Sequence, residues 1–179
     1  VIGFVLICSA GLFLITRVEA TVIVTLLVVF VGLLSGSASS LAEEKILLER
    51  DTMYHHLSVV DTKNIRYLKF DRQLQSGMLL SAPRRSALRY TDFLHLAIVF
   101  RPESRRLLVV GLGGGSAQKE FYYDYPWMKV ETAELDPVVV QVARRYFFIP
   151  TDGRFVIHEE DGRRFLARSS DSYDIIIMD

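Results

Sequence analysis

One stretch of the sequence decides the expected fold: "LLVVGLGGGSAQKEF", from Leu107 to Phe121. Four apolar residues lead into a cluster of glycines, and the residues from Ser116 onward can open a helix. A buried strand that passes through glycines into a helix is typical of chains whose backbone approaches a nucleotide closely. The loop lacks the lysine of a P-loop, so the hydrolysis of nucleoside triphosphates is not expected.

The sequence that follows this stretch alternates between strand and helix patterns. Short apolar runs rich in β-branched residues predict three more strands, and two amphipathic runs predict the helices between them. Such alternation predicts βαβ units, a parallel sheet and right-handed crossovers, with the strands in the order third, second, first, fourth. The segments are, in chain order, "KVETAELD", "PVVVQVARRYF", "RFVIHEED", "GRRFLAR" and "YDIIIMD".

Polar or glycine-rich residues follow each of the four predicted strands. The first strand ends in the glycine loop, the second in Glu134, the third in Asp161 and Gly162, and the fourth in Asp179. An acid after the second strand can accept hydrogen bonds from ribose hydroxyls, and an acid followed by glycine can accept one from an adenine amino group. The set therefore predicts an adenosyl ligand, with NAD and S-adenosylmethionine as the alternatives.

Residues 43–82 predict a small β-domain before the α/β domain of residues 83–179. The segments "HHLSVVD" and "IRYLKFD", with Thr62, Lys63 and Asn64 between them, predict a β-hairpin, and "DRQLQSG" predicts a turn and a short strand. Most of the apolar residues between Ser86 and Ile98 suit one face of a single helix.

Residues 1–42 predict a transmembrane helical hairpin. Residues 1–16 and 20–42 carry no charge, and the second run would span roughly 34 Å as a helix. We therefore expect a multi-pass membrane protein that contacts lipid and carries its catalytic domain on the cytoplasmic side. The alternative is a signal peptide, because Ser40-Leu41-Ala42 resembles a cleavage site of small residues.

Composition narrows the function further. The formal net charge is +0, which argues against nucleic acid as a partner, because nucleic-acid-binding domains usually carry a basic patch. Cys8 is the one cysteine, so no internal disulfide can form. Apart from His55 and His56 the histidines are scattered, and no metal site is expected. Composition leaves association into a homo-oligomer open.

From about Glu49 to Asp179 the chain resembles the polyamine aminopropyltransferases, the spermidine and spermine synthase family, in the variant fused to membrane spans. The resemblance implies a methyltransferase-like Rossmann half-sheet behind a small β-domain. It also implies transfer of an aminopropyl group from decarboxylated S-adenosylmethionine (or use of S-adenosylmethionine) to a polyamine or other small amine, with no prosthetic group. The segments that carry it are "ERDTMYHHLSVV", "YLKFDRQLQSG", "LRYTDF", "LLVVGLGGGS", "VETAELDPVVVQVARRYF", "EEDGRRFL" and "YDIIIMD".

The resemblance also implies roles for single residues. On the donor side, the glycine loop would cradle the sulfonium side of the nucleoside, Glu134 would hold the ribose, and Asp161 with Gly162 would contact adenine. On the acceptor side, Gln75 would line the site between donor and acceptor, Tyr90 would lie beside the amine, and Asp179 would receive or orient the amine's proton. The glycines of the loop are Gly111, Gly113, Gly114 and Gly115.

Three positions depart from the family's pattern. Gly114 stands where the family has an aspartate that grips the donor's amino group, Thr91 replaces a glutamine or histidine, and His55, at a substrate-binding position, replaces a glutamine. Gly114 matters most, because the donor's amine loses its counter-charge. Two alternatives to an active enzyme therefore stay open: an adenosyl-binding domain with impaired catalysis, and an accessory domain of a multi-span membrane protein or transporter.

Overall fold

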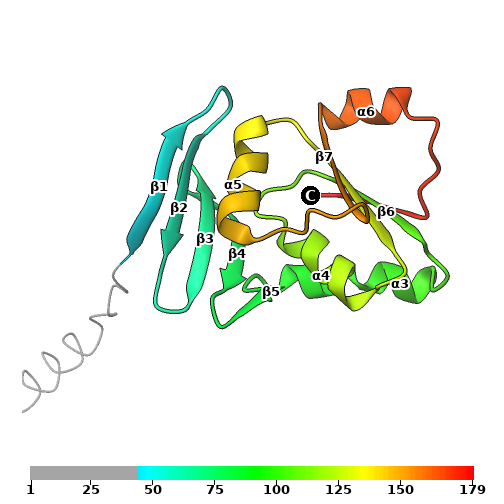
Figure 1. Cartoon of the computed structure of the whole chain (residues 1–179), viewed down its shortest axis with the longest axis horizontal. Helices are drawn as coiled ribbons and strands as arrows, with labels where there is room; N and C mark the ends of the chain where they lie inside the picture. The colour runs from blue at the N-terminus through cyan, green and yellow to red at the C-terminus, as the bar shows by residue number, and fades with distance from the viewer. Residues whose placement is uncertain (1–43) are drawn as a thin grey trace, which may run out of the picture. The chain divides into compact units, whose positions relative to one another are not determined.

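The structure, a computed structural model, describes residues 44–179, which form two β-sheets and the helices around them (Figure 1). The first sheet has five antiparallel strands and the second has four parallel strands. The described residues 44–179 all belong to one compact unit, so both sheets are part of the same folded body.

The five-stranded sheet is a meander in which each strand pairs with the next along the chain. The predicted hairpin is confirmed, because β2 and β3 are antiparallel neighbours joined through residues 62–64. Two strands were not predicted, β1 and β5, and β5 carries the sheet past the expected domain boundary at residue 82. The strands are β1 (Lys45–Asp51), β2 (His56–Asp61), β3 (Ile65–Phe70), β4 (Gln73–Leu79) and β5 (Ala82–Ser86).

The four-stranded sheet confirms the predicted strand order. Its strands lie in the order β8-β7-β6-β9, and every neighbouring pair is parallel. Because parallel strands end at the same edge, this order brings the polar residues that follow all four strands to one side of the sheet. The strands are β6 (Arg106–Val110), β7 (Lys129–Glu134), β8 (Phe155–Glu159) and β9 (Ile175–Met178).

Helices cover both faces of the parallel sheet (Figure 1). On one face α4 (Ser116–Asp124) and α5 (Pro137–Phe147) pack on alternate residues of β6 and β7, such as Leu107 and Val130. On the other face α6 (Gly162–Arg168) sets Phe165 against Leu108 and Ala133. The change of face between α5 and α6 follows from right-handed crossovers once the strand order reverses.

The helix predicted between Ser86 and Ile98 is wrong in its bounds. Ser86 ends strand β5, and two short helices follow, α2 (Tyr90–Leu94) and α3 (Leu96–Phe100), with His95 between them. Leu94, Ala97 and Ile98 of the predicted face do pack against the core, whereas Phe93 is 69% exposed. The Ser86 N–H donates to the Glu120 carboxylate at 2.9 Å, which keeps this part of the chain extended.

The two sheets share a core through helix α5. Val139, Val142 and Phe147 of α5 pack against buried residues of the meander such as Leu57 and Leu68. In Figure 1 α5 accordingly stands between the meander and the parallel sheet.

Lys119 adds a polar link to this core. Its side chain is 1% exposed, and its Nζ donates to the carbonyl oxygens of Pro83 and Phe147, both at 2.7 Å. Burial lowers the pKa of Lys119 to about 8. A single amine thus connects the meander, helix α4 and the end of α5.

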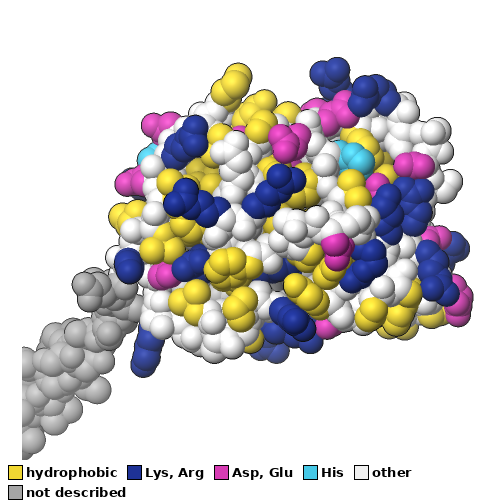
Figure 2. All heavy atoms as spheres, viewed as in Figure 1, with side chains coloured by type: hydrophobic (Ala, Val, Ile, Leu, Met, Phe, Trp, Pro, Cys, Tyr) yellow, Lys and Arg dark blue, Asp and Glu magenta, His cyan; other side chains and the backbone are white. Residues whose placement is uncertain are grey.

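The predicted transmembrane hairpin of residues 1–42 lies outside the described residues. Within residues 44–179 no helix combines the length and the apolar character needed to cross a membrane. On the face drawn in Figure 2, charged side chains of both signs are interspersed with hydrophobic ones.

Candidate functional site

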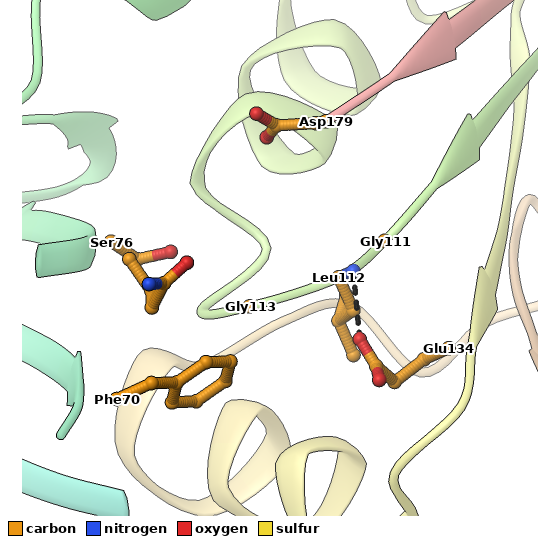
Figure 3. A pocket seen from close by; sticks show the side chains of 8 residues that line it. Phe70, Ser76, Gly111, Leu112, Gly113, Glu134 and Asp179 are labelled. Carbon is orange, nitrogen blue, oxygen red and sulfur yellow. Dashed lines mark hydrogen bonds between the residues drawn. The ribbon is translucent and has the colours of Figure 1, made fainter. Parts of the chain in front are cut away.

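A pocket of about 200 Å³ lies at the edge of the parallel sheet where the strands end (Figure 3). Residues of both sheets line it, so the site belongs to neither sheet alone. Two of the lining side chains are carboxylates, and none of those described is a lysine or arginine, which favours a cationic or hydroxyl-rich ligand. The lining residues are Phe70, Gln75, Ser76, Gly111, Leu112, Gly113, Glu134 and Asp179.

The glycine loop follows β6 and requires glycine at two positions above all. Gly111 has φ of 104°, and a Cβ there would lie 2.5 Å from the backbone oxygen of Asp179. Gly115 has φ of 66°, and a Cβ there would lie 2.6 Å from Ile149. Side chains are therefore excluded at both positions by backbone conformation and by space. Of the predicted glycines, Gly111 and Gly113 line the pocket, whereas Gly114 and Gly115 pack behind it.

Glu134 holds the loop as well as lining the pocket. Its Oε2 accepts from the Leu112 N–H at 2.9 Å, drawn as the dashed line in Figure 3, and its Oε1 accepts from the Asp136 N–H at 2.8 Å. Each carboxylate oxygen retains a second lone pair, so Glu134 can still accept hydrogen bonds from two ribose hydroxyls.

The structure brings the two predicted catalytic residues together. The Tyr90 hydroxyl donates to Asp179, with oxygen–oxygen distances of 3.2 Å and 3.0 Å to the two carboxylate oxygens. Burial and the charge of Asp179 raise the pKa of Tyr90 well above its usual value, so the phenol stays protonated and remains a donor. Asp179 lines the pocket directly, and Tyr90 reaches it through Asp179.

Glu120, on α4, supports the helix that carries Tyr90. It is 2% exposed, accepts from the Ser86 N–H, and has its Oε2 3.9 Å from Nε2 of His95. Burial would raise the pKa of Glu120, but the His95 ring, the Ser86 N–H and Thr91 outweigh it and keep the pKa below its ordinary value. This buried carboxylate therefore fixes the chain on both sides of Tyr90. Thr91, a departure from the family pattern, is buried against it.

Asp161 and Gly162 lie after β8, at the same edge as Glu134, but neither lines the pocket. Oδ1 of Asp161 caps helix α6 by accepting from the N–H groups of Arg163 and Arg164 at 2.9 Å and 3.0 Å. A Cβ on Gly162 would lie 2.3 Å from Val110, so this glycine lets α6 approach β6. Both residues thus have structural tasks beside the adenine contact that the resemblance implies.

His55 reaches the pocket only through Phe70. The two rings are stacked, with centroids 4.3 Å apart and planes 7° from parallel. Gln75 lines the pocket itself. Phe70 was missed from the sequence, where it reads as one more apolar residue of a strand.

Gly114 is packed rather than open. Its N–H donates to the Ser76 hydroxyl at 2.7 Å, and a Cβ there would lie 2.8 Å from the Phe147 ring and 2.9 Å from the Ser76 Cβ. The space beside the family's aspartate position is therefore filled from two sides. Ser76 too was missed from the sequence, because nothing about a serine in a strand signals a contact with a loop 38 residues away.

The site residues offer no arrangement for a metal ion. Within the described residues, no three or more His, Cys, Asp or Glu side chains lie close enough together to hold one. The chemistry of the pocket rests on carboxylates, a phenol, an amide and backbone N–H groups.

Comparisons with known proteins agree with this geometry. The sequence profile of the spermine/spermidine synthase domain matches residues 88–179. A polyamine aminopropyltransferase from Vibrio vulnificus is 28% identical over 151 residues, which cover 80% of this chain and 50% of that protein. The chain therefore spans about half the length of the curated relatives that it matches.

Solved structures show the same fold at low identity. A probable spermidine synthase from Corynebacterium glutamicum superposes with a TM-score of 0.65 at 21% identity, covering 75% of this chain and 52% of that one. A spermidine synthase solved with the transition state analogue AdoDATO gives 0.63 at 17% identity, covering 75% and 47%.

Proposed function

The chain belongs to the spermine/spermidine synthase domain family, and from that premise we propose that it transfers an aminopropyl group from decarboxylated S-adenosylmethionine to a small amine. The observation that carries the proposal is the Tyr90–Asp179 pair at the pocket that Glu134 also lines. Two carboxylates that follow different strands line this one pocket, which suits a ligand that carries both ribose hydroxyls and a cationic amine.

In the proposed complex Glu134 accepts hydrogen bonds from the ribose. The glycine loop, fixed by Glu134 and Ser76, presents backbone rather than side chains to the ligand, so the ribose and sulfur can lie close to it. Gln75 and Asp179 then face the part of the donor that carries the aminopropyl group. Asp161 and Gly162 contribute the adenine contact at the far end.

The reaction itself requires positioning and one proton acceptor. The lone pair of the acceptor amine attacks the aminopropyl carbon bonded to sulfur, the new N–C bond forms as the C–S bond breaks, and the bonding electrons stay on sulfur. Methylthioadenosine leaves, and Asp179 takes the proton that the amine loses. Only the neutral amine is a nucleophile, so a carboxylate at this point contributes both attraction for the cation and removal of its proton. The sulfonium is already a good leaving group, and the remaining task is alignment.

Tyr90 orients Asp179 in this scheme. Because its phenol stays protonated, it donates a hydrogen bond and holds the carboxylate in place. Each carboxylate oxygen keeps a lone pair for the amine. Glu120 and His95 act one step further out, by fixing the helix that carries Tyr90.

The test is the release of methylthioadenosine by the purified full chain, supplied with decarboxylated S-adenosylmethionine and putrescine. We expect product from the wild type and a loss of about 10²-fold or more in Asp179→Asn, with the donor still bound. Glu103→Ala, a change of an exposed carboxylate outside the pocket, is the control. Donor binding without any methylthioadenosine release would leave the chain as a binding domain.

That second function, an adenosyl-binding domain with impaired catalysis, is favoured by one specific observation. Gly114 lacks the family's aspartate, and Phe147 and Ser76 fill the space beside it. In this alternative the pocket binds methylthioadenosine or a related nucleoside, and the chain serves a multi-span membrane protein as an accessory domain.

We further propose that residues 1–42 hold the chain in a membrane as two spans, with the domain of residues 44–179 on the cytoplasmic side. The support is the pair of uncharged runs in the sequence. Carbonate washing of cell membranes tests it: the chain should stay in the membrane fraction, and its release into the wash would count against the spans.

A further inference from the structure

We propose that Phe70, backed by His55, recognises the positive charge of the donor's sulfonium and thereby sets the preference of the pocket for cationic ligands. The inference rests on the proposed function and deepens it, because it names the group that distinguishes the reactive donor from its neutral product.

Phe70 offers an aromatic surface to the pocket. It is the last residue of β3, and one face of its ring is covered by the stacked imidazole of His55, 4.3 Å away between centroids. Phe70 is also one of the residues that line the pocket. In Figure 3 the ring points from the meander toward Leu112 and Glu134. The stacking holds the ring in one orientation, so the aromatic surface is already in place when a ligand arrives.

Phe70 lines the same pocket as the residues that hold the two ends of the donor in the proposed complex. The ribose lies at Glu134 and the transferred group lies toward Gln75 and Asp179, so the sulfur that joins them lies between these residues. Phe70 lines the same pocket from the meander side, with its ring directed toward Leu112 and Glu134, which is the side from which it would approach the sulfur in the proposed complex. A cation within about 6 Å of an aromatic centroid is attracted by the electron-rich face of the ring.

Neither carboxylate of the pocket is positioned to contact the sulfonium in the proposed complex. Both oxygens of Glu134 already accept backbone N–H groups and face the ribose, and Asp179 is held by Tyr90 at the amine end. Position 114 supplies no carboxylate, and Phe147 and Ser76 occupy the space around it. Among the described residues that line the pocket, Phe70 is the one aromatic side chain.

Two departures from the family pattern are then linked. His55 stands at a substrate-binding position where the family has glutamine, and in this chain it stacks on Phe70. Gly114 removes a negative charge from the donor side of the pocket. In the proposed complex the aromatic pair attracts the sulfonium charge of a donor whose amino group has no carboxylate at position 114.

The experiment compares two ligands that differ in charge at sulfur alone, apart from one methyl group. They are decarboxylated S-adenosylmethionine, a sulfonium, and its demethylated thioether, which keeps the same ammonium group. Calorimetry measures both dissociation constants for the full chain and for Phe70→Leu, which keeps apolar bulk but removes the aromatic face. Phe70→Tyr keeps the face, and Phe100→Leu makes the same chemical change at a residue 82% exposed on α3.

We expect Phe70→Leu to weaken sulfonium binding by about three- to thirtyfold and thioether binding by less than about twofold. Phe70→Tyr and Phe100→Leu should leave both constants near their wild-type values. Equal weakening of both ligands by Phe70→Leu would overturn the inference, because the ring would then be only an apolar wall, while the proposed function would stand. If the wild type binds neither ligand, the proposed function fails and the inference fails with it. If Phe70→Leu does not fold, a loss of sulfonium preference in Phe70→Tyr overturns the inference and its retention supports it.

Discussion

The Glu134 carboxylate accepts a hydrogen bond from the Leu112 N–H at 2.9 Å, across from the end of one strand to the loop after its neighbour. The acid expected to hold the ribose therefore also shapes the loop that the ribose must approach. Binding and loop geometry are coupled through one side chain, and a mutation of Glu134 acts on both.

Glu134→Ala should weaken the binding of methylthioadenosine by about 1–3 kcal/mol, because the ribose loses a charged acceptor and the Leu112 N–H loses its partner. Glu134→Gln keeps one carbonyl oxygen for that N–H and should lose less. Calorimetry on both variants checks the order, with Glu103→Ala as the surface control. Equal losses in the alanine and glutamine variants would show that the loop contact contributes nothing.

Two substitutions of Asp161 distinguish its role in capping helix α6 from its proposed role in ligand binding. Asp161→Ala should lower the free energy of unfolding by about 0.5–2 kcal/mol, because α6 loses its cap. Asp161→Asn retains a capping oxygen and should unfold like the wild type. If the carboxylate also accepts from adenine, the asparagine variant alone will bind methylthioadenosine more weakly at unchanged stability. If Asp161→Asn binds methylthioadenosine as the wild type does, Asp161 caps helix α6 and does not contact the ligand.

Tyr90→Phe should lower the turnover number about tenfold and leave the KM for the donor unchanged, because its hydroxyl contacts Asp179 and does not line the donor pocket. Steady-state release of methylthioadenosine measures both constants. A rise in the donor KM at constant turnover number would place the phenol in donor binding instead.

Gly114 cannot accept a side chain without rearrangement. Its φ is compatible with other residues, but a Cβ would lie 2.8 Å from the Phe147 ring. Restoring the family's aspartate here, which sequence alone suggests as a gain for amine-bearing donors, should first destabilise the fold. We expect Gly114→Ala to cost about 1–3 kcal/mol, and less in a Phe147→Leu background. Urea unfolding of the single and double variants gives the coupling, and additive costs would show that Phe147 is not the obstacle.

Lys119 makes stability depend on pH. Its pKa is about 8 in the folded chain, below the value of about 10.4 of an unfolded chain, so between these values the unfolded chain binds more protons. The contribution of Lys119 to stability should therefore rise with pH from about 8 to about 10.4, by roughly 1–3 kcal/mol, and stay flat below pH 8.

The control for this prediction is Lys119→Met, which removes the titrating group. The free energy of unfolding of wild type and variant is measured in urea at pH 7.5, 8.5 and 9.5, which lie roughly below the window, in its lower part and in its upper part. The difference between the two proteins separates the effect of Lys119 from that of the tyrosines, whose raised pKa values act in the opposite direction. A difference that is constant over this range would show that the amine titrates normally.

Local patterns were enough to predict the parallel sheet. The run 107–110 is apolar throughout because β6 is buried on both faces, and the acids at Glu134 and Asp179 mark strand ends. Strand β1 escaped notice because most of its residues are exposed and its sequence, KILLERD, mixes charged with apolar residues. The break at His95 depends on partners that lie 25 and 30 residues away, Glu120 and Tyr125, and no local pattern reports such contacts.

Some residues of the candidate site could likewise be predicted from the sequence, and others could not. Gly111, Glu134 and Asp179 were predictable because packing alone seldom places glycines and acids directly after apolar strands. Phe70 and Ser76 were not, because an aromatic and a serine in a meander strand look like ordinary packing until the second sheet is placed against them.

The Lys119 amine donates hydrogen bonds to the carbonyls of both Pro83 and Phe147. We therefore expect the α/β part to fold poorly when it is separated from the meander. A piece beginning at residue 87 would keep every strand of the parallel sheet. Three hydrogen bonds would nevertheless be lost. The Lys119 amine would lose the Pro83 carbonyl, the Glu120 carboxylate would lose the Ser86 N–H, and the Gly114 N–H would lose the Ser76 hydroxyl. The pocket therefore depends on the meander as well as on the parallel sheet, and recombination between relatives should succeed only when the exchanged block begins upstream of β1.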